Sequence, residues 1–269
     1  MQQPIAILDS GVGGLTVAKE VMRQLPKERI IYFGDTERAP YGPRKAEEVI
    51  AFTEQIVHFL SQFNPKMIVI ACNTATAFAI DVIRSQVPVP VVGVIHPGAR
   101  AAIKKTRTRV VGVIGTEGTI RSGAYKKALE ELAPDIVVHS QACPNLVPLV
   151  EKGLFASDEA LETVRASLAP FKGLAIDCLI LGCTHYPFLQ NQISEVMGAE
   201  VELINSAEET AREISAILAH RGQLSRSSGE PVHHFFCSGD PMMFQKIARK
   251  WLGRQVQVTP IVWQVPRII

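Results

Sequence analysis

Several features that mark common classes of protein are missing from this sequence. No stretch reaches the ~20 consecutive apolar residues of a membrane-spanning helix, no CxxC pair occurs, and no Gly-Lys-Ser or Gly-Lys-Thr is present. We therefore expect no membrane span, zinc ribbon, thioredoxin-type redox pair or P-loop. Charge is also scarce, since 20% of the residues are charged and the formal net charge is +2. This balance disfavours nucleic acid or an anionic membrane surface as a partner and suits an enzyme of small substrates.

The first apolar run of the chain is short, because residues 4–8 are followed at once by Asp9. A signal peptide needs a basic start and a longer apolar stretch, so we expect a soluble, cytoplasmic protein. The glycine-rich segment at residues 11–16 resembles a dinucleotide-binding fingerprint, but Thr16 stands where the third glycine would be. We interpret these glycines as a tight turn between a strand and a helix.

Short apolar runs alternate with amphipathic segments along the sequence, which is typical of α/β proteins. We expect strands at residues 5–8, 30–33, 67–71, 89–94, 110–114, 136–139, 178–181, 200–204, 232–237 and 256–262. We expect helices at about residues 15–25, 46–63 and 241–251, with others beginning after Cys72, near Ile120 and after Cys183. Ser206 and Glu209 have the spacing of a capping box, which predicts a helix over residues 206–220.

The sequence contains two similar halves. In each half a strand is followed by a small polar turn and a helix, and the turns are Asp9-Ser10-Gly11 and Thr116-Glu117-Gly118. Later in each half, at a similar distance along the chain, a strand ends in a cysteine followed closely by threonine. These cysteines are Cys72 and Cys183. The repetition predicts two related units of α/β structure.

We predict an α/β fold with two similar parallel-sheet domains related by pseudo-symmetry and the active site in the cleft between them. Continuous apolar strands indicate sheets covered by helices on both faces. The last part of the chain is too short for a third domain, so we expect it to pack back onto the first. The predicted domains are residues 1–97 with 207–269, and residues 98–206.

Two of the five cysteines occupy equivalent positions. Cys72 and Cys183 each end a strand, at the edge where parallel sheets bind ligands. A helix that begins there stabilises a thiolate, so we expect a lowered thiol pKa at both positions. A buried cysteine often serves packing alone, and this is our interpretation of Cys143, Cys178 and Cys237, which lack this context. A matched pair instead favours a functional role.

Two thiols that face one another across a cleft suit racemisation. One sulfur removes the proton from one face of Cα while the other returns a proton to the opposite face. His185 lies two residues after Cys183, which keeps a Cys–His nucleophile open as an alternative. A non-catalytic binding module for a small carboxylate, with inert thiols, is a second alternative. Asp9, if it lies beside Cys72, could bind a substrate ammonium or help to move a proton.

Several motifs together resemble those of the glutamate racemases of bacterial cell-wall synthesis. The matching stretches are Asp9-Ser10-Gly11-Val12-Gly13-Gly14, Gly34-Asp35, Pro40-Tyr41-Gly42, Ala71-Cys72-Asn73-Thr74-Ala75 and Leu181-Gly182-Cys183-Thr184-His185-Tyr186-Pro187. Their order and spacing agree along nearly the whole chain. The resemblance implies glutamate as substrate, a supply of D-glutamate for peptidoglycan, and no pyridoxal phosphate, nucleotide or metal. Enzymes of this kind are often homodimers, so a homodimer is one assembly we consider.

The resemblance also assigns residues to the site. It implies that Cys72 and Cys183 are the acid–base residues, one for each enantiomer, accompanied by Asp9, His185 and Glu151. The residues implied to line the substrate are Asp9, Ser10, Tyr41, Gly42, Asn73, Thr74, Thr184 and His185. An aspartate or hydantoin racemase of the same type stays open as an alternative, because reasoning from the residues alone does not reach the side-chain carboxylate.

Overall fold

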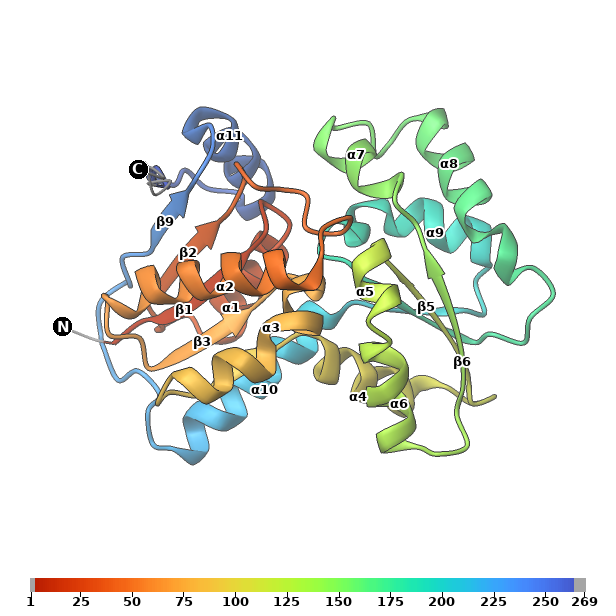
Figure 1. Ribbon diagram of the computed structural model, residues 1–269, viewed down its shortest axis with the longest axis horizontal. Helices are drawn as coiled ribbons and strands as arrows, with labels where there is room; N and C mark the ends of the chain where they lie inside the picture. The colour runs from red at the N-terminus through yellow and green to blue at the C-terminus, as the bar shows by residue number, and fades with distance from the viewer. Residues whose placement is uncertain (1–2, 264–269) are drawn as a thin grey trace.

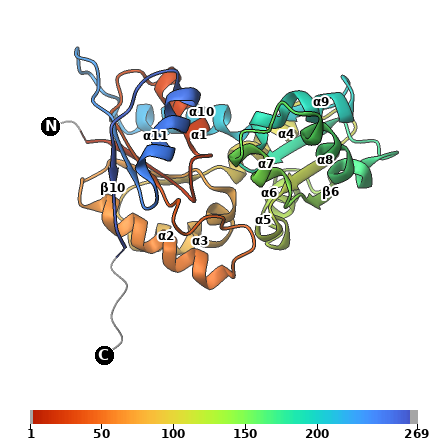
Figure 2. The same ribbon diagram turned by 90° about the horizontal axis from the view of Figure 1, so that it is seen from above.

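The computed structural model describes residues 3–263, which form two lobes lying side by side (Figures 1 and 2). Within these residues the first lobe is built on a six-stranded sheet and the second on a four-stranded sheet. The strands of the first sheet are β1 (Ile5–Asp9), β2 (Ile30–Gly34), β3 (Met67–Ile70), β4 (Val91–Gly93), β9 (His234–Cys237) and β10 (Val258–Pro260). Those of the second are β5 (Val110–Gly115), β6 (Val137–Ala142), β7 (Cys178–Gly182) and β8 (Glu202–Ile204). All the paired strands are parallel.

Helices cover both faces of each sheet. In the first half of the chain they are α1 (Leu15–Gln24), α2 (Ala46–Ser61), α3 (Asn73–Gln86), α4 (Ile95–Lys105), α5 (Glu117–Arg121) and α6 (Ala124–Leu132). In the second half they are α7 (Leu146–Glu151), α8 (Asp158–Leu168), α9 (Gln190–Met197), α10 (Ser206–His220) and α11 (Pro241–Leu252), with 3-10 turns η1 (Ala169–Phe171) and η2 (Tyr186–Leu189).

Strand β1 shows how the sequence produces this layered arrangement. Ile5 and Ile7 pack into the apolar cluster beneath α1, α10 and α11, whereas Ala6 and Leu8 pack into the cluster beneath α2 and α3. Because side chains alternate along a strand, a strand covered on both faces must be apolar at every position. Each large side chain buried in this way contributes roughly 1.5–3 kcal/mol.

The two sheets repeat one strand order. The first runs β10-β9-β2-β1-β3-β4 and the second β6-β5-β7-β8, so β2-β1-β3-β4 corresponds to β6-β5-β7-β8. Cys72 follows β3 and Cys183 follows β7, which are corresponding strands. The predicted fold class, two similar parallel-sheet α/β domains related by pseudo-symmetry, is confirmed. Strands β9 and β10 extend only the first sheet.

Two helices carry the chain between the lobes. Helix α4 leads from β4 to β5, and α10 leads from β8 back to the first lobe. They pack against each other, while α10 also packs on α1 and α4 on α6. This helix pair therefore ties the two sheets together (Figure 1).

Two predicted helix N-termini differ in detail from the structure. The helix expected near Ile120 is two helices, α5 and α6, separated at Gly123, whose φ of 67° lies in the left-handed region and breaks the helix. The helix over residues 206–220 is present, but its N-cap is Asn205. The Asn205 side chain accepts a hydrogen bond from the backbone N–H of Ala207, so the capping box expected at Ser206 does not form.

The α-helix expected directly after Cys183 was also wrong. The chain forms the 3-10 turn η2 there, and α9 begins only at Gln190. Pro187 has no N–H to donate to the carbonyl of Cys183, as an α-helix would require. That carbonyl instead accepts a hydrogen bond from the N–H of Tyr186, three residues on, which is the 3-10 pattern. The predicted strand over residues 256–262 shortens to β10.

Candidate active site

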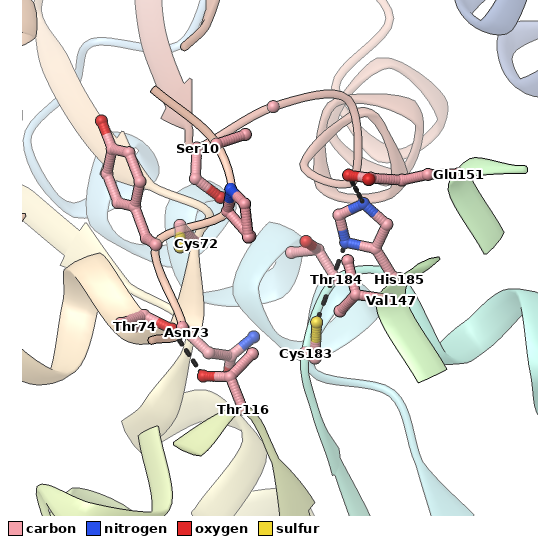
Figure 3. A pocket seen from close by; sticks show the side chains of 15 residues that line it. Ser10, Cys72, Asn73, Thr74, Thr116, Val147, Glu151, Cys183, Thr184 and His185 are labelled. Atoms are coloured by element: carbon pink, nitrogen blue, oxygen red, sulfur yellow. Dashed lines mark hydrogen bonds and ion pairs between the residues drawn. The ribbon is translucent and has the colours of Figure 1, made fainter. Parts of the chain in front are cut away.

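A small cavity lies between the lobes, beyond the carboxyl ends of β1, β3 and β7. All the predicted site residues except Asp9 line it: Ser10, Tyr41, Gly42, Cys72, Asn73, Thr74, Glu151, Cys183, Thr184 and His185. Figure 3 shows Cys72 and Cys183 on opposite sides of this space. The cavity volume of about 30 Å³ is room for roughly two water molecules. The site is therefore closed and must widen to admit an amino acid.

Cys72 ends the β3 segment and is the N-cap of α3. Its sulfur accepts a hydrogen bond from the backbone N–H of Ala75 at 3.4 Å, so the predicted helix N-terminus is present. The lowered pKa expected from it is not. Burial and the charge of Asp9 raise the pKa of Cys72 to about 12, although hydrogen bonds from Ser10 and Ala75 oppose the rise. The Cys72 sulfur is therefore a protonated thiol at neutral pH.

Cys183 has a different set of neighbours. Its sulfur lies 3.8 Å from Nδ1 of His185, and Nε2 of His185 lies 3.5 Å from Oε1 of Glu151 (Figure 3). Burial alone would lower the pKa of His185, but contacts with Cys183 and Glu151 and the charge of Asp9 raise it to about 10. The resulting imidazolium stabilises negative charge on the Cys183 sulfur. The two sulfurs thus have different charged neighbours, Asp9 near Cys72 and the His185 imidazolium beside Cys183.

Asp9 ends β1 and lies behind the cavity wall with no exposed surface. Its Oδ2 accepts a hydrogen bond from the N–H of Gly11 at 2.9 Å, and its Oδ1 lies 3.5 Å from Oγ1 of Thr184 in the second lobe. Burial raises the pKa of Asp9, while the charge of His185 opposes this rise. Asp9 therefore acts on the Cys72 thiol through its charge, and its carboxylate contacts the second lobe at the Thr184 hydroxyl.

Gly13 permits a close approach of the two lobes. A Cβ at this position would lie 2.2 Å from Oγ1 of Thr184 and 2.7 Å from Nδ1 of His185. Carbon does not approach such atoms so closely without displacement. The glycine-rich turn interpreted from the sequence as a strand-to-helix turn thus also makes room for the second lobe.

Three threonine hydroxyls meet at the cavity. Oγ1 of Thr74, on α3, lies 2.8 Å from Oγ1 of Thr116 and 3.1 Å from Oγ1 of Thr119. Thr116 is the N-cap of α5, so this contact joins the two lobes. The Nδ2 of Asn73 is buried nearby and has no hydrogen-bond partner within residues 3–263. Hydroxyl and amide donors gathered in this way match a carboxylate.

Some residues of the cavity were not among the predicted site residues. Thr116, Val147, Ala39 and Pro40 line it, and Thr119 lies directly behind Thr116. For Thr116 the internal repeat was the available signal, since it follows β5 as Ser10 follows β1. Val147 carries no such signal, because an apolar residue on a short helix reads as ordinary core.

The loop after β2 supplies Tyr41 and Gly42 to the wall. The Tyr41 hydroxyl donates to the buried carboxylate of Asp35, so other atoms of Tyr41 face the cavity. The carbonyl of Gly42 accepts a hydrogen bond from the N–H of Gly118 at 2.8 Å. This bond fastens the loop to the second lobe and closes that side of the site.

The arrangement supports acid–base chemistry on both faces of one bound carbon. Each lobe contributes one sulfur at a matching strand end, and each sulfur has its own charged neighbour. Within residues 3–263, no group of three or more His, Cys, Asp or Glu side chains is placed to hold a metal ion. Across the described part of the chain, we find no helix with the length and apolar character needed to cross a membrane.

Paired thiols at corresponding strand ends of a repeated α/β fold define an amino-acid racemase, an isomerase that moves a proton between the faces of Cα. Comparison with known proteins agrees with this class. The model of the Asp/Glu/hydantoin racemase family matches residues 13–214, and the chain belongs to this family.

Individual relatives match nearly the full length of the chain. The glutamate racemase of Bacillus cereus is 53% identical over 257 residues, covering 96% of this chain and 96% of its own. That of Oceanobacillus iheyensis is 55% identical over 250 residues, covering 93% and 91%. The crystal structure of a glutamate racemase from Bacillus anthracis has a TM-score of 0.94 at 51% identity and covers 96% of this chain and 97% of its own. A glutamate racemase from Francisella tularensis, in complex with D-glutamate, has a TM-score of 0.91 at 32% identity and covers 97% of both chains.

Proposed function

We propose that this chain interconverts L- and D-glutamate by proton transfer at Cα between two thiols, without a cofactor. The observation that supports this most strongly is the position of Cys72 and Cys183 on opposite sides of one cavity, at corresponding strand ends of the two lobes. The relatives that are 51% to 55% identical to the chain are glutamate racemases, which favours glutamate over the aspartate and hydantoin alternatives.

In one direction Cys183 is the base. Its thiolate, stabilised by the His185 imidazolium, takes the proton from one face of Cα and becomes a thiol. The electron pair left on Cα delocalises toward the α-carboxylate. The Cys72 thiol then gives its proton to the opposite face and becomes a thiolate. The opposite enantiomer uses the same two groups with their roles exchanged, so protons balance over each direction.

The site offers two sets of groups for the two carboxylates of glutamate. The hydroxyls of Thr74 and Thr116, together with the free amide donors of Asn73, suit the α-carboxylate, where charge develops as the proton leaves. Ser10 and the segment Tyr41-Gly42 lie at the wall formed by the first lobe and suit the side-chain carboxylate. Asp9, Thr184 and Glu151 complete the implied set, with Glu151 acting through His185.

We further propose the setting in which the activity operates. D-Glutamate made in the cytoplasm would supply peptidoglycan synthesis, consistent with relatives that are bacterial glutamate racemases. We propose a homodimer as the assembly. We also propose that the two sheets mark two domains, residues 1–97 with 207–269, and residues 98–206. Of these, residues 1–2 and 264–269 lie outside the described part of the chain.

Incubation of the purified chain with each glutamate enantiomer in deuterated water, with no cofactor added, tests the proposal. We expect exchange of the α-proton and racemisation from both sides, and slower turnover of aspartate and of a hydantoin. If neither glutamate enantiomer exchanged, the chain would instead be a non-catalytic carboxylate-binding protein. Faster turnover of aspartate or of the hydantoin would reassign the substrate within the same family.

A further inference from the structure

Tyr125 lies at the junction of the lobes, behind the wall of the cavity. It is the second residue of α6 and is only 2% exposed. Its hydroxyl donates a hydrogen bond to Oδ1 of Asn73 at 2.7 Å. Ser206, at the start of α10, lies close by, since a Cβ on Gly98 would meet both the Tyr125 hydroxyl and Cβ of Ser206 at 3.3 Å. The phenol thus lies where a helix of the second lobe, the start of α3 in the first lobe, and a helix that connects them meet.

This hydrogen bond sets which end of the Asn73 amide faces the cavity. A phenol has a single proton, and because an amide oxygen can only accept, that proton is directed to Oδ1 of Asn73. Nδ2 is then left with two donors that have no partner within residues 3–263. The side chain is buried and lines the cavity beside Thr116 (Figure 3). A buried donor without a partner is costly, and an acceptor on a bound ligand removes that cost.

The ring of Tyr125 also packs beside the residue that precedes the second thiol. A Cβ on Gly182, the residue before Cys183, would lie 3.0 Å from Cε2 of Tyr125. A Cβ on Gly98, in α4, would lie 3.3 Å from the Tyr125 hydroxyl. The two glycines therefore admit the tyrosine to the junction. Tyr125 touches a chain neighbour of each sulfur, Asn73 after Cys72 and Gly182 before Cys183.

We propose that Tyr125 is a positioning residue of the reaction, which holds the Asn73 amide with its nitrogen toward a carboxylate of the bound amino acid. The identity of that amino acid rests on the function proposed above. Tyr125 takes no part in proton transfer, and its effect passes through Asn73. A carboxylate contact of this kind exists in both the bound substrate and the transition state. Its loss therefore raises KM, and because negative charge grows on the α-carboxylate as the proton leaves, kcat falls as well.

A double-mutant cycle with Tyr125→Phe and Asn73→Ala tests this. We expect Tyr125→Phe alone to raise KM for glutamate by about three- to tenfold, the effect of one hydrogen bond. In the Asn73→Ala background the same substitution should leave KM unchanged, because the group it positions is gone. An equal rise in KM in both backgrounds would overturn the proposal, as would a fall in kcat with KM unchanged.

Tyr186→Phe is the matched control. Tyr186 is another fully buried tyrosine, and its hydroxyl donates to the carbonyl of Cys143 at 2.9 Å. Its substitution should have the same effect on KM with or without Asn73. If Tyr125→Phe failed to fold, Gly98→Ala would take its place in the cycle, because its Cβ would press on the Tyr125 hydroxyl at 3.3 Å; the smaller rise in KM should again disappear in Asn73→Ala, and additivity would overturn the proposal.

Failure of the proposed function would look different from failure of this inference. No turnover of either glutamate enantiomer by the unaltered chain would refute the function. The same cycle would then be measured as the Kd for glutamate by calorimetry, with the same expectation of coupling between Tyr125 and Asn73. Turnover by the unaltered chain together with additive substitutions would refute only the role of Tyr125.

Discussion

Gly13→Ala tests whether the two lobes must close against each other for activity. The new methyl group would lie 2.2 Å from Oγ1 of Thr184 and 2.7 Å from Nδ1 of His185. Restoring normal contact requires a displacement of roughly 1 Å between the glycine-rich turn and the segment that carries Cys183. The substitution thus disturbs the contact between the lobes beside Cys183, including the His185 ring, without replacing any ionisable group.

The magnitude follows from the energy of overpacking. Inserting a methyl group into a packed contact costs about 1–3 kcal/mol. If this cost is felt only in the closed state, kcat/KM should fall by about 5- to 150-fold in both directions. The free energy of unfolding should fall by less than the barrier rises, because the lobes can part to relieve the clash. Racemisation rates from each enantiomer and a urea unfolding curve measure the two effects.

Gly229→Ala is the matched control. A Cβ at Gly229 meets no atom of the described residues within 4 Å, and its φ is outside the left-handed region. This variant should keep the wild-type kcat/KM and be as stable or slightly more stable, since alanine restricts the unfolded chain. If Gly13→Ala folded and kept the wild-type kcat/KM in both directions, the closed contact would be irrelevant to the reaction.

Two further predictions concern charge. Glu151 helps to raise the pKa of His185 from 6.5 to about 10. The imidazolium therefore contributes stability that is complete below the unfolded pKa of 6.5 and is lost as pH rises from there to about 10. In Glu151→Gln the alkaline fall in kcat/KM should move to lower pH, by less than about one unit because Glu151 is half-exposed; an unmoved pH profile would contradict this. The buried Asp35 carboxylate accepts hydrogen bonds from four side chains, Arg38 among them. Asp35→Asn should therefore lower the free energy of unfolding by about 3 kcal/mol. The exposed control Asp81→Asn should leave the free energy of unfolding unchanged. Equal urea unfolding curves for the two variants would refute the stabilising role of the Asp35 carboxylate.

Some parts of the site could be predicted from the sequence because they depend on local patterns. Cys72 and Cys183 end apolar runs of strand length, and parallel strands bring such ends to one edge. The echo between the two halves then pairs the cysteines. The same repeat indicates Thr116 as a cavity residue, because Thr116 follows β5 as Ser10 follows β1.

Other parts depend on contacts between the lobes, which leave no periodic pattern in the chain. Tyr125 reads as one apolar position on a helix, and nothing near it in the sequence points to Asn73, which it contacts. The state of the Cys72 thiol is a similar case. Its helix N-terminus could be predicted, but the burial that outweighs it arises only from the packing of the folded chain around it. The 3-10 turn after Cys183 forms because Pro187 lacks an N–H, and the spacing of motifs does not predict this.

The central claim is that each sulfur serves one face of Cα, and Cys72→Ser and Cys183→Ser test it most directly. Loss of either acid–base group should lower racemisation of both glutamate enantiomers by about 100- to 10,000-fold. Cys237→Ser, the same change at a buried thiol outside the cavity, should keep wild-type racemisation. The measurement is racemisation from each enantiomer in deuterated water, with circular dichroism to confirm that the variants fold. We expect racemisation to be lost in both cavity variants and kept in the control; full racemisation by either Cys72→Ser or Cys183→Ser would show that the reaction does not need both sulfurs.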